Sequence, residues 1–367
     1  MLSLTTFLCL NVGGCVKVSA VSSSAVAAAV IYADTGEIIY SKNCEERLPM
    51  ASTTKIMSAL LLCEYGNLDR EIKVTREMVT VEGSSMGLLP DDIVTLRGLL
   101  YGMMLPSGND AANATAHVVG GSVEGFIELM NKKALELGLN NTHFVTPSGL
   151  DAEGHYTTAY ELALLAAKAL ENSDFLAAAS AKSAVLYYGN PPYRRTLTNH
   201  NKLLGSYEGL IGVKTGFTKK SGRCLVTAAE RDGKRIIAVT LHDSNDWQDH
   251  KVLLDYGFSQ IKSQDVLPET ESITLSVVGG EQNSVTAKIP AVTVNTVGEK
   301  QLETTLLSED FLYAPIKAGQ NVGTLCIYSD GVLLKKVDIK ADKAVPLIKN
   351  SKKEKFKNIF LDILSAI

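Results

Sequence analysis

The sequence predicts an α+β fold in which helices flank an antiparallel sheet, followed by a small all-β domain and an amphipathic C-terminal helix. Three observations favour this arrangement. In residues 24–262, segments in which apolar and polar residues alternate, as in strands, lie before and after a long region in which apolar residues have helical spacing. Beyond residue 263 apolar and polar residues alternate again. The chain ends on a stretch that begins with lysines and carries apolar residues at helical spacing. The 367 residues are enough for two domains.

The first elements are a hairpin and a helix. Residues 24–43 predict two strands joined by the turn Asp34-Thr35-Gly36. In MASTTKIMSALLL, residues 50–62, the apolar positions predict a helix that begins near Ala51. Ser52 and Lys55 are then i, i+3 neighbours at the helix N-terminus.

A serine hydroxyl is a weak nucleophile at neutral pH, and a neutral lysine one turn further on can serve as its base. Backbone N–H groups at a helix N-terminus can also stabilise an oxyanion. Taken alone, however, the pattern of Ser52 and Lys55 more often marks an N-capping serine followed by a solvated lysine.

More helices follow, and then a run of strands. Residues 97–138 have an interrupted helical pattern that ends at Gly138, a C-cap residue, and Thr158 with Glu161 matches a capping box for a helix over 159–172. Residues 210–241 contain three short β-like runs, and Asp232-Gly233 between the last two predicts a tight hairpin. A helix over 246–261 closes this region.

The remaining strands, between about residues 264 and 344, predict a separate all-β domain with no cluster of chemically competent side chains, so we expect a scaffold or spacer there. The six cysteines and six histidines lack metal-ligand spacing, and we expect neither a metal nor a cofactor. No basic stripe interleaved with aromatic residues is present, which argues against nucleic-acid binding.

The two ends of the chain indicate export and a membrane surface. Residues 1–20 are typical of a secretory signal peptide, although no Lys or Arg precedes their apolar stretch; a lipoprotein signal with Cys15 lipidated is the second interpretation. The tail carries lysines at its start and apolar residues at helical spacing, which suits a helix lying on an anionic membrane. These apolar residues are Phe356, Ile359, Phe360, Ile363, Leu364 and Ile367, and the lysines are 352, 353, 355 and 357. We expect segments over 1–20, 21–262, 263–345 and 346–367.

Two further motifs change the interpretation of Ser52. Pro106-Ser107-Gly108-Asn109 lies at a turn before a helical stretch, and Lys214-Thr215-Gly216 lies on the first strand of the 210–241 run. In this order, S-x-x-K, S-x-N and K-T-G form the three-part signature of penicillin-recognising serine enzymes.

With these motifs, and with the longer stretches ASTTKIM, PSGNDAA and VKTGFTKKSGRCLVTAA, the chain resembles the D-alanyl-D-alanine carboxypeptidases of the low-molecular-mass penicillin-binding proteins, of the penicillin-binding protein 5 type. The resemblance also covers the order of signal peptide, catalytic domain, β-rich domain and amphipathic helix. It implies a β-lactamase/transpeptidase-like catalytic domain, a peptidoglycan stem peptide as substrate, acylation by β-lactam antibiotics, and a place on the outer face of the cytoplasmic membrane.

The resemblance also implies a role for each motif residue. Ser52 resembles the nucleophile, Lys55 its base, and Ser107 a proton relay to the leaving amine. Asn109 is expected to hold the substrate amide and the lysine. Lys214 and Thr215 are expected to receive the terminal carboxylate, and Gly216 lets the substrate backbone approach the strand. Backbone N–H groups of Ser52 and Phe217 are expected to form the oxyanion hole.

Three alternatives stay open at this point. A class A β-lactamase shares all three motifs but needs a glutamate that activates the deacylating water, and Glu136 lies in a matching E-x-x-L-N string; we interpret it as a solvated helix end. An endopeptidase or transpeptidase resolves the same acyl-enzyme differently. A non-catalytic envelope protein with a decayed site is disfavoured because every motif residue is present. The sequence does not specify an oligomeric state.

Overall fold

The computed structural model describes residues 21–266 and 270–348. They form two compact units. The first contains Tyr40–Glu230 and Ile236–Tyr256 together with the described residues up to Ile31. The second contains the chain from Gly257 onward with two short segments, Tyr32–Ile39 and Arg231–Arg235. The predicted signal peptide and most of the predicted terminal helix lie outside the described residues.

The central sheet of the first unit has five strands in the order β2-β1-β9-β8-β7. The strands are β1 (Ala27–Tyr32), β2 (Ile38–Lys42), β7 (Leu210–Thr218), β8 (Gly222–Arg231) and β9 (Lys234–Leu241). The N-terminal hairpin therefore completes a sheet whose other strands lie about 180 residues further on, and both predicted hairpins are confirmed. Strand β7 is at the edge, so one side of its backbone has no neighbouring strand in this sheet.

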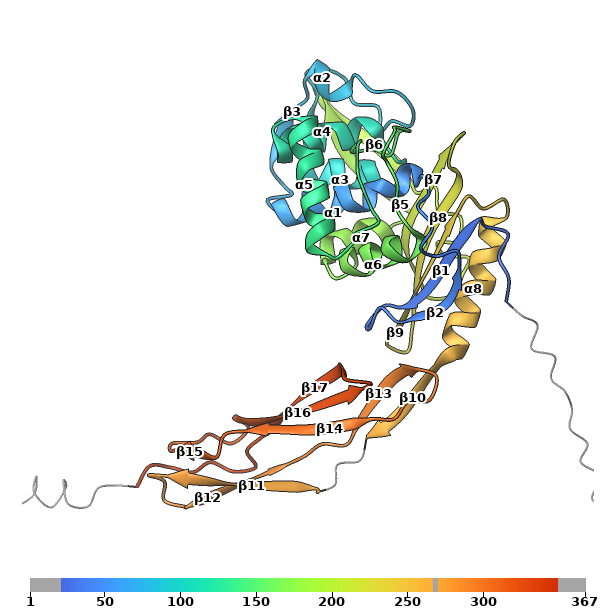
Figure 1. Ribbon diagram of the computed structural model, residues 1–367. Coiled ribbons are helices and arrows are strands. Elements are labelled where there is room, and N and C mark those ends of the chain that lie inside the picture. Colours follow the sequence, from blue (N-terminus) through green and yellow to red (C-terminus); the bar gives the residue numbers. More distant parts are fainter. Residues whose placement is uncertain (1–20, 267–269, 349–367) are drawn as a thin grey trace, which may run out of the picture. The chain divides into compact units, whose positions relative to one another are not determined.

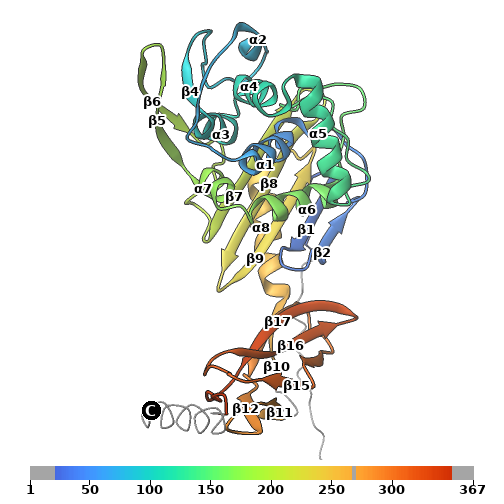
Figure 2. The same cartoon turned by 90° about the vertical axis from the view of Figure 1, so that its left-hand side faces the viewer.

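Helices cover both faces of this sheet. Figures 1 and 2 show α8 (Asp246–Gln260) on one face and a cluster of helices on the other. Strand β1 is buried along its whole length, as a strand covered on both faces must be. The cluster consists of α1 (Lys55–Tyr65), α3 (Leu96–Met104), α4 (Asn109–Gly120), α5 (Val123–Glu136), α6 (Ala159–Ala169) and α7 (Ser173–Ser180), with the 3₁₀ turn η1 (Ala51–Thr54) before α1 and the short α2 (Arg76–Val79) above α4.

The structure corrects two details of the sequence analysis. Only half of the predicted capping box forms: Thr158 accepts a hydrogen bond from the Glu161 N–H, but the Glu161 carboxylate instead accepts from Asn141 N at 2.8 Å. A second sheet, β3-β4-β5-β6, was not predicted. Its strands β3 (Glu71–Lys73) and β4 (Ile93–Thr95) are too short for a period to show, and β5 (Ser183–Gly189) and β6 (Pro192–Thr198) form a largely exposed hairpin.

The second unit is all-β, as predicted. It contains the sheets β10-β13, β12-β11-β15 and β14-β16-β17, which enclose an aliphatic core that includes Val277, Ile327 and Ile339. The strands are β10 (Ile261–Val266), β11 (Ser272–Val278), β12 (Ser284–Lys288), β13 (Val292–Val297), β14 (Glu303–Ser308), β15 (Phe311–Tyr313), β16 (Asn321–Ser329) and β17 (Val332–Lys340). In the described ranges, no helix is long and apolar enough to cross a bilayer.

Candidate active site

Ser52 lies on the turn η1, and Lys55 is the first residue of α1. The preceding Ala51 has a φ of +48°, so the chain turns sharply just before Ser52. A 3₁₀ turn places residues i and i+3 directly above one another, more closely than an α-helical turn does. The Lys55 Nζ accordingly lies 3.0 Å from the Ser52 Oγ, and the predicted pairing is present in the structure.

The amino group of Lys55 is enclosed by oxygen atoms. Its Nζ lies 2.7 Å from Asn109 Oδ1 and 2.7 Å from the backbone oxygen of Ser148. The side chain is fully buried, and burial is the main cause that lowers its pKa well below the usual value, with the nearby Lys214 as a second cause. Lys55 can therefore lose its proton at a pH where an exposed lysine stays charged.

The contacts of Lys55 also fix the direction of proton transfer. A neutral amine has two N–H donors and one lone pair, whereas the oxygens of Asn109 and Ser148 can only accept. Once these two oxygens take both hydrogens, the lone pair remains for the third neighbour, the Ser52 hydroxyl. This geometry suits removal of the Ser52 proton by Lys55.

The loop between α5 and α6 supplies the Ser148 oxygen and is tied to η1. His155 Nδ1 accepts from Val145 N at 2.9 Å, so its Nε2 carries the hydrogen and donates to Thr54 Oγ1 at 2.8 Å. Burial lowers the pKa of His155 to about 4, which keeps the ring neutral. Gly149 packs so closely on η1 that a Cβ there would collide with the oxygen of Ala51.

Ser107 and Asn109 reach the site from the turn before α4. Ser107 has a φ of +63°, and its buried Oγ has no hydrogen-bond partner among the described residues although it lines the pocket beside Ser52. Asn109 is 4% exposed, and its Nδ2 donates to Glu82 O at 2.6 Å. Asn109 is thus held on one side while its oxygen orients Lys55, and Ser107 keeps free hydrogen-bonding capacity.

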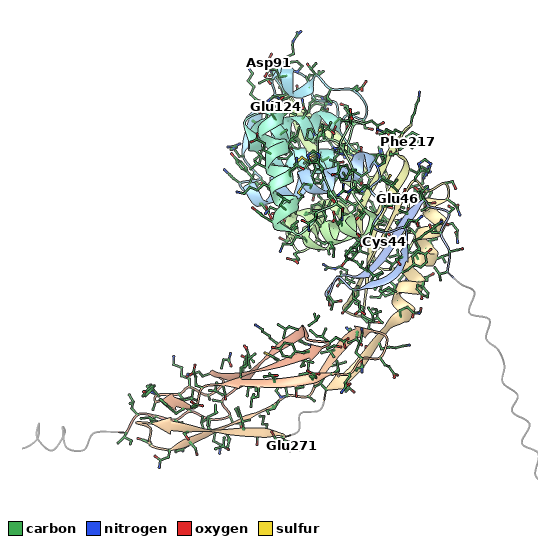
Figure 3. The ribbon with its side chains drawn as sticks, in the orientation of Figure 1. Cys44, Glu46, Asp91, Glu124, Phe217 and Glu271 are labelled. Carbon is green, nitrogen blue, oxygen red and sulfur yellow. The ribbon has the colours of Figure 1, made fainter. Side chains whose placement is uncertain are left out.

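Strand β7 forms the other wall. A Cβ on Gly216 would lie 3.1 Å from Ser52 N, so the absence of a side chain lets η1 and β7 approach one another. Lys214 is only 1% exposed, its Nζ donates to Thr215 O at 2.9 Å, and burial lowers its pKa to about 7. Phe217 is 66% exposed near the end of β7, where Figure 3 marks it.

A pocket of about 250 Å³ opens between these walls. Of the predicted residues, Ser52, Ser107, Thr215, Gly216 and Phe217 line it, while Lys55, Asn109 and Lys214 lie buried behind them. The sequence analysis did not predict the remaining lining residues, which are Ser84, His200, Arg223, Asp246 and Trp247. No local sequence pattern marks any of the five, and Arg223 reaches the pocket because the β7–β8 hairpin brings it back beside the K-T-G motif.

Glu136 lies elsewhere, at the last residue of α5. Its side chain is 48% exposed and forms an ion pair with Lys133 at 3.1 Å. It does not line the pocket. The interpretation of Glu136 as a solvated helix end therefore agrees with the structure.

A helix-start serine beside a buried lysine, a second serine in the same pocket and an edge strand next to both define the class of penicillin-recognising serine acyl-transfer enzymes. The family model described as D-alanyl-D-alanine carboxypeptidase matches residues 15–245, and the model of the penicillin-binding protein 5 C-terminal domain matches residues 263–347. The chain belongs to the D-alanyl-D-alanine carboxypeptidase family.

Individual relatives agree with this family. The D-alanyl-D-alanine carboxypeptidase DacF of Bacillus subtilis is 35% identical over 333 residues, which cover 87% of this chain and 85% of the relative. DacC of Escherichia coli is 35% identical over 319 residues, which cover 81% of this chain and 78% of the relative. Among solved structures, a Streptomyces DD-transpeptidase is 35% identical with a TM-score of 0.62 over 65% of this chain and 98% of its own. The carboxypeptidase DacD of Francisella tularensis is 27% identical with a TM-score of 0.64, and the match covers 89% of this chain and 94% of that structure.

Proposed function

We propose that the chain removes the terminal D-alanine from peptidoglycan stem pentapeptides through an acyl-enzyme on Ser52. The observation that supports this most directly is the Ser52 Oγ at 3.0 Å from a buried lysine whose other two contacts are acceptors. Lys55 takes the hydroxyl proton as Oγ attacks the carbonyl carbon between the two D-alanines. The backbone N–H groups of Ser52 and Phe217 are our candidates for stabilising the oxyanion.

Collapse of the tetrahedral intermediate breaks the C–N bond and releases D-alanine. The leaving nitrogen needs a proton, and we assign its delivery to Ser107, which passes on the proton that Lys55 has accepted. The unpartnered Ser107 Oγ in the pocket supports this role. Water then attacks the ester in a second step with Lys55 again as base, which frees Ser52.

The substrate backbone has a natural place along β7. Because β7 is an edge strand, an extended peptide can pair with it as an added strand. Thr215 lines the pocket where its hydroxyl can donate to the terminal carboxylate. Lys214 lies buried behind Thr215, and we assign it an electrostatic effect on Lys55. Asn109 holds Lys55 in place.

The first test is release of D-alanine from a pentapeptide that ends in D-Ala-D-Ala, with residues 21–367 as the enzyme. We expect free D-alanine from the parent protein and none from Ser52→Ala. The same pair should differ in covalent labelling by a fluorescent penicillin. D-alanine release that persists in Ser52→Ala would exclude Ser52 as the nucleophile.

Transpeptidation is the second candidate, because the structural relative from Streptomyces is named a DD-transpeptidase. The acyl-enzyme can be resolved by an amine in place of water. Adding an amine acceptor such as glycine or a D-amino acid to the assay gives the ratio of the two products. A cross-linked product that exceeds the hydrolysed peptide at millimolar acceptor would favour transpeptidation.

A β-lactamase activity is disfavoured by the position of Glu136 at the surface. We expect Glu136→Ala to leave both acylation by a β-lactam and the slow release of the acyl group unchanged. Normal acylation combined with a block of β-lactam turnover in this variant would instead identify Glu136 as the residue that activates water. Glu128→Ala, at an exposed position on the same helix, is a suitable surface control.

We further propose export of the chain and attachment of its C-terminal end to the outer face of the cytoplasmic membrane. The lysines and apolar residues of the tail sequence support attachment. Exposed apolar residues on the second unit support it too: Val278 is 49% exposed, Phe311 46% and Tyr313 70%. Strands β11 and β15 place Val278 beside Tyr313, and the Ile348 N–H donates to Gly279 O, so this surface lies where the chain leaves toward residue 349.

A further inference from the structure

A cation that no motif predicts forms part of the wall of the active-site pocket. Arg223 lies on β8 directly opposite Phe217 of β7. Paired residues of an antiparallel sheet point to the same face, and alternate residues of one strand do as well. Thr215, Phe217 and Arg223 therefore share one face at the edge of the sheet, and all three line the pocket with Ser52. The side chain of Lys214 belongs to the opposite face.

Two residues at the start of α8 hold Arg223 in position. Its Nη2 donates to Asp246 Oδ1 at 2.7 Å, and its guanidinium carbon lies 5.5 Å from the centre of the Trp247 ring. Asp246 is itself 5% exposed, and the same Oδ1 accepts from Trp247 N at 2.8 Å, so this support is rigid. The Arg223 side chain remains 42% exposed.

This arrangement leaves donors of Arg223 available to a ligand. A guanidinium has five N–H donors in a planar fork, and the bond to Asp246 uses only one of them. The Arg223 Nε has no hydrogen-bond partner among the described residues but is buried, so the donors that a ligand can reach are those of the terminal nitrogens of the 42% exposed side chain. An oxygen ligand with two acceptor atoms would satisfy such a fork, and a carboxylate is of that kind.

The reaction requires an anion site close to Ser52. In a peptide, the carboxylate carbon of the last residue is three covalent bonds from the preceding carbonyl carbon, so the two lie within about 4 Å. The group that binds this carboxylate must therefore be in the wall of the pocket that contains Ser52. Arg223 meets this requirement, and the buried Lys214 does not line the pocket.

We propose that Arg223, held by Asp246 and Trp247, binds the free terminal carboxylate of the substrate together with the Thr215 hydroxyl. It thereby selects peptides with a free C-terminal D-alanine. This inference rests on the proposed carboxypeptidase function and names the specificity-determining residue for it. Arginine suits the task because its charge persists at every physiological pH and its fork matches two carboxylate oxygens.

The experiment compares a diacetylated Lys-D-Ala-D-Ala peptide with the same peptide as a C-terminal amide, which lacks the negative charge. The kcat/KM of each is measured for the parent protein, Arg223→Gln, Arg223→Lys and the exposed control Arg194→Gln on β6. For Arg223→Gln we expect a loss of about 10- to 100-fold on the acid, the range of a charge-assisted hydrogen bond, and little change on the amide. Arg223→Lys should recover part of the loss, and Arg194→Gln should show none.

The pH dependence separates Arg223 from Lys214. The acid-to-amide ratio of kcat/KM cancels the ionisation of groups that serve both substrates, including Lys55 and His200, which face Lys214. If Arg223 binds the carboxylate, the ratio stays constant from pH 6 to 9. A ratio that declines through about pH 7 to 8 would assign the carboxylate to Lys214, whose pKa is about 7, and would overturn the inference.

Other outcomes are also decisive. Equal losses on acid and amide in Arg223→Gln, or no loss on either, would exclude Arg223 as the carboxylate ligand. Turnover of the amide, which lacks the carboxylate, shows in the same samples whether a variant is folded and chemically competent. If the parent protein released neither D-alanine from the acid nor D-alaninamide from the amide, the proposed function itself would fail, and that result is distinct from an unaltered ratio in Arg223→Gln.

Discussion

At the scale of single residues, Lys55 shows how burial makes a base from a side chain that is ordinarily an acid. Three oxygen atoms surround its Nζ, and solvent does not reach it. Loss of solvation disfavours the charged form, and the neighbouring Lys214 disfavours it further. The neutral amine is the form that can accept the Ser52 proton.

Replacing Lys55 with arginine tests this account. Arginine stays protonated, so Lys55→Arg keeps a cation and removes the base. We expect the rate constant of acylation by a fluorescent penicillin to fall by about 10²- to 10⁴-fold, the usual contribution of a general base. Lys168→Arg, a surface residue paired with Glu171, serves as the control. A fall of less than tenfold in Lys55→Arg would mean that another group accepts the proton.

His155 gives a prediction for stability. Its pKa is lowered to about 4 in the folded protein by burial, against about 6.5 in an unfolded chain. Above pH 6.5 neither state binds the proton and the contribution of His155 is fully present. As the pH falls from 6.5 to 4, only the unfolded state binds it, and the free energy of unfolding falls by the order of 3 kcal/mol.

Urea unfolding at several pH values between 7 and 4 measures this slope. His155→Gln supplies an acceptor and a donor for the same two hydrogen bonds and removes the titration, so its slope should be smaller than that of the parent protein. Part of the slope should remain, because His250 is fully buried and its pKa is lowered to about 3. Identical slopes in the two proteins would show that His155 is not neutral and buried as described.

Much of the site was predictable from these residue types. The motifs located Ser52, Lys55, Ser107 and Thr215, because their chemistry depends on spacing along one turn or one strand. Arg223 was not predicted because its place depends on the register of β7 against β8, which brings it opposite Phe217. Trp247 likewise reaches the pocket only through the packing of α8 on the sheet, and no local pattern reports that.

At the scale of elements, the loop between α5 and α6 acts as a support for the turn η1. Its residues contribute the Ser148 oxygen to Lys55 and the His155 ring to Thr54. Glu161 of α6 fixes the start of this loop through Asn141 N, which explains why the reciprocal capping bond is absent. A capping motif identified the start of α6 correctly but could not show that the glutamate has a tertiary partner.

Two glycines of this loop allow a matched test. Gly149 has a φ of +87°, and a Cβ there would collide with the backbone oxygen of Ala51. Gly154 has a φ of +80°, but its Cβ would meet nothing closer than 3.8 Å. Both alanine variants bear the backbone strain of about 1–2 kcal/mol, and only Gly149→Ala adds the clash, worth about 1–3 kcal/mol more.

We therefore expect Gly149→Ala to lower the free energy of unfolding more than Gly154→Ala and to slow penicillin acylation by displacing Ser148. Gly154→Ala should acylate at the parent rate. Denaturant unfolding and the acylation rate, measured on the same preparations of the two variants, test both expectations. Equal stability and equal rates in the two variants would contradict the close packing of this loop on η1.

At the scale of the whole molecule, composition and periodicity predicted the two kinds of architecture. The five-stranded sheet and the all-β unit were expected because their strands show a clear period or a hairpin turn. The exposed β5–β6 hairpin was missed because it alternates weakly and contributes little to the core. Hydrophobic periodicity arises because apolar side chains occupy the buried positions of an element, so an element that is mostly exposed shows the weakest pattern.

The membrane proposal predicts that membrane binding and catalysis depend on different parts of the chain. Deleting residues 350–367 removes the lysines and apolar residues of the tail but leaves the first unit and its pocket intact. We expect this variant to appear in the soluble fraction of cells with its D-alanine release unchanged. Replacing lysines 352, 353, 355 and 357 with glutamine should weaken binding to anionic vesicles, by about 1 kcal/mol for each lysine.

Phosphatidylglycerol-containing vesicles and neutral phosphatidylcholine vesicles provide the comparison, and salt should weaken binding only to the anionic ones. Phe311→Ser with Tyr313→Ser in the full chain tests whether the exposed apolar surface contributes in addition to the tail. If the deletion variant stayed on membranes, an anchor at the other end would be required, and Cys15→Ala would show whether lipidation supplies it. Because the residues that line the pocket all lie between Ser52 and Trp247, none of these changes should alter the acylation rate.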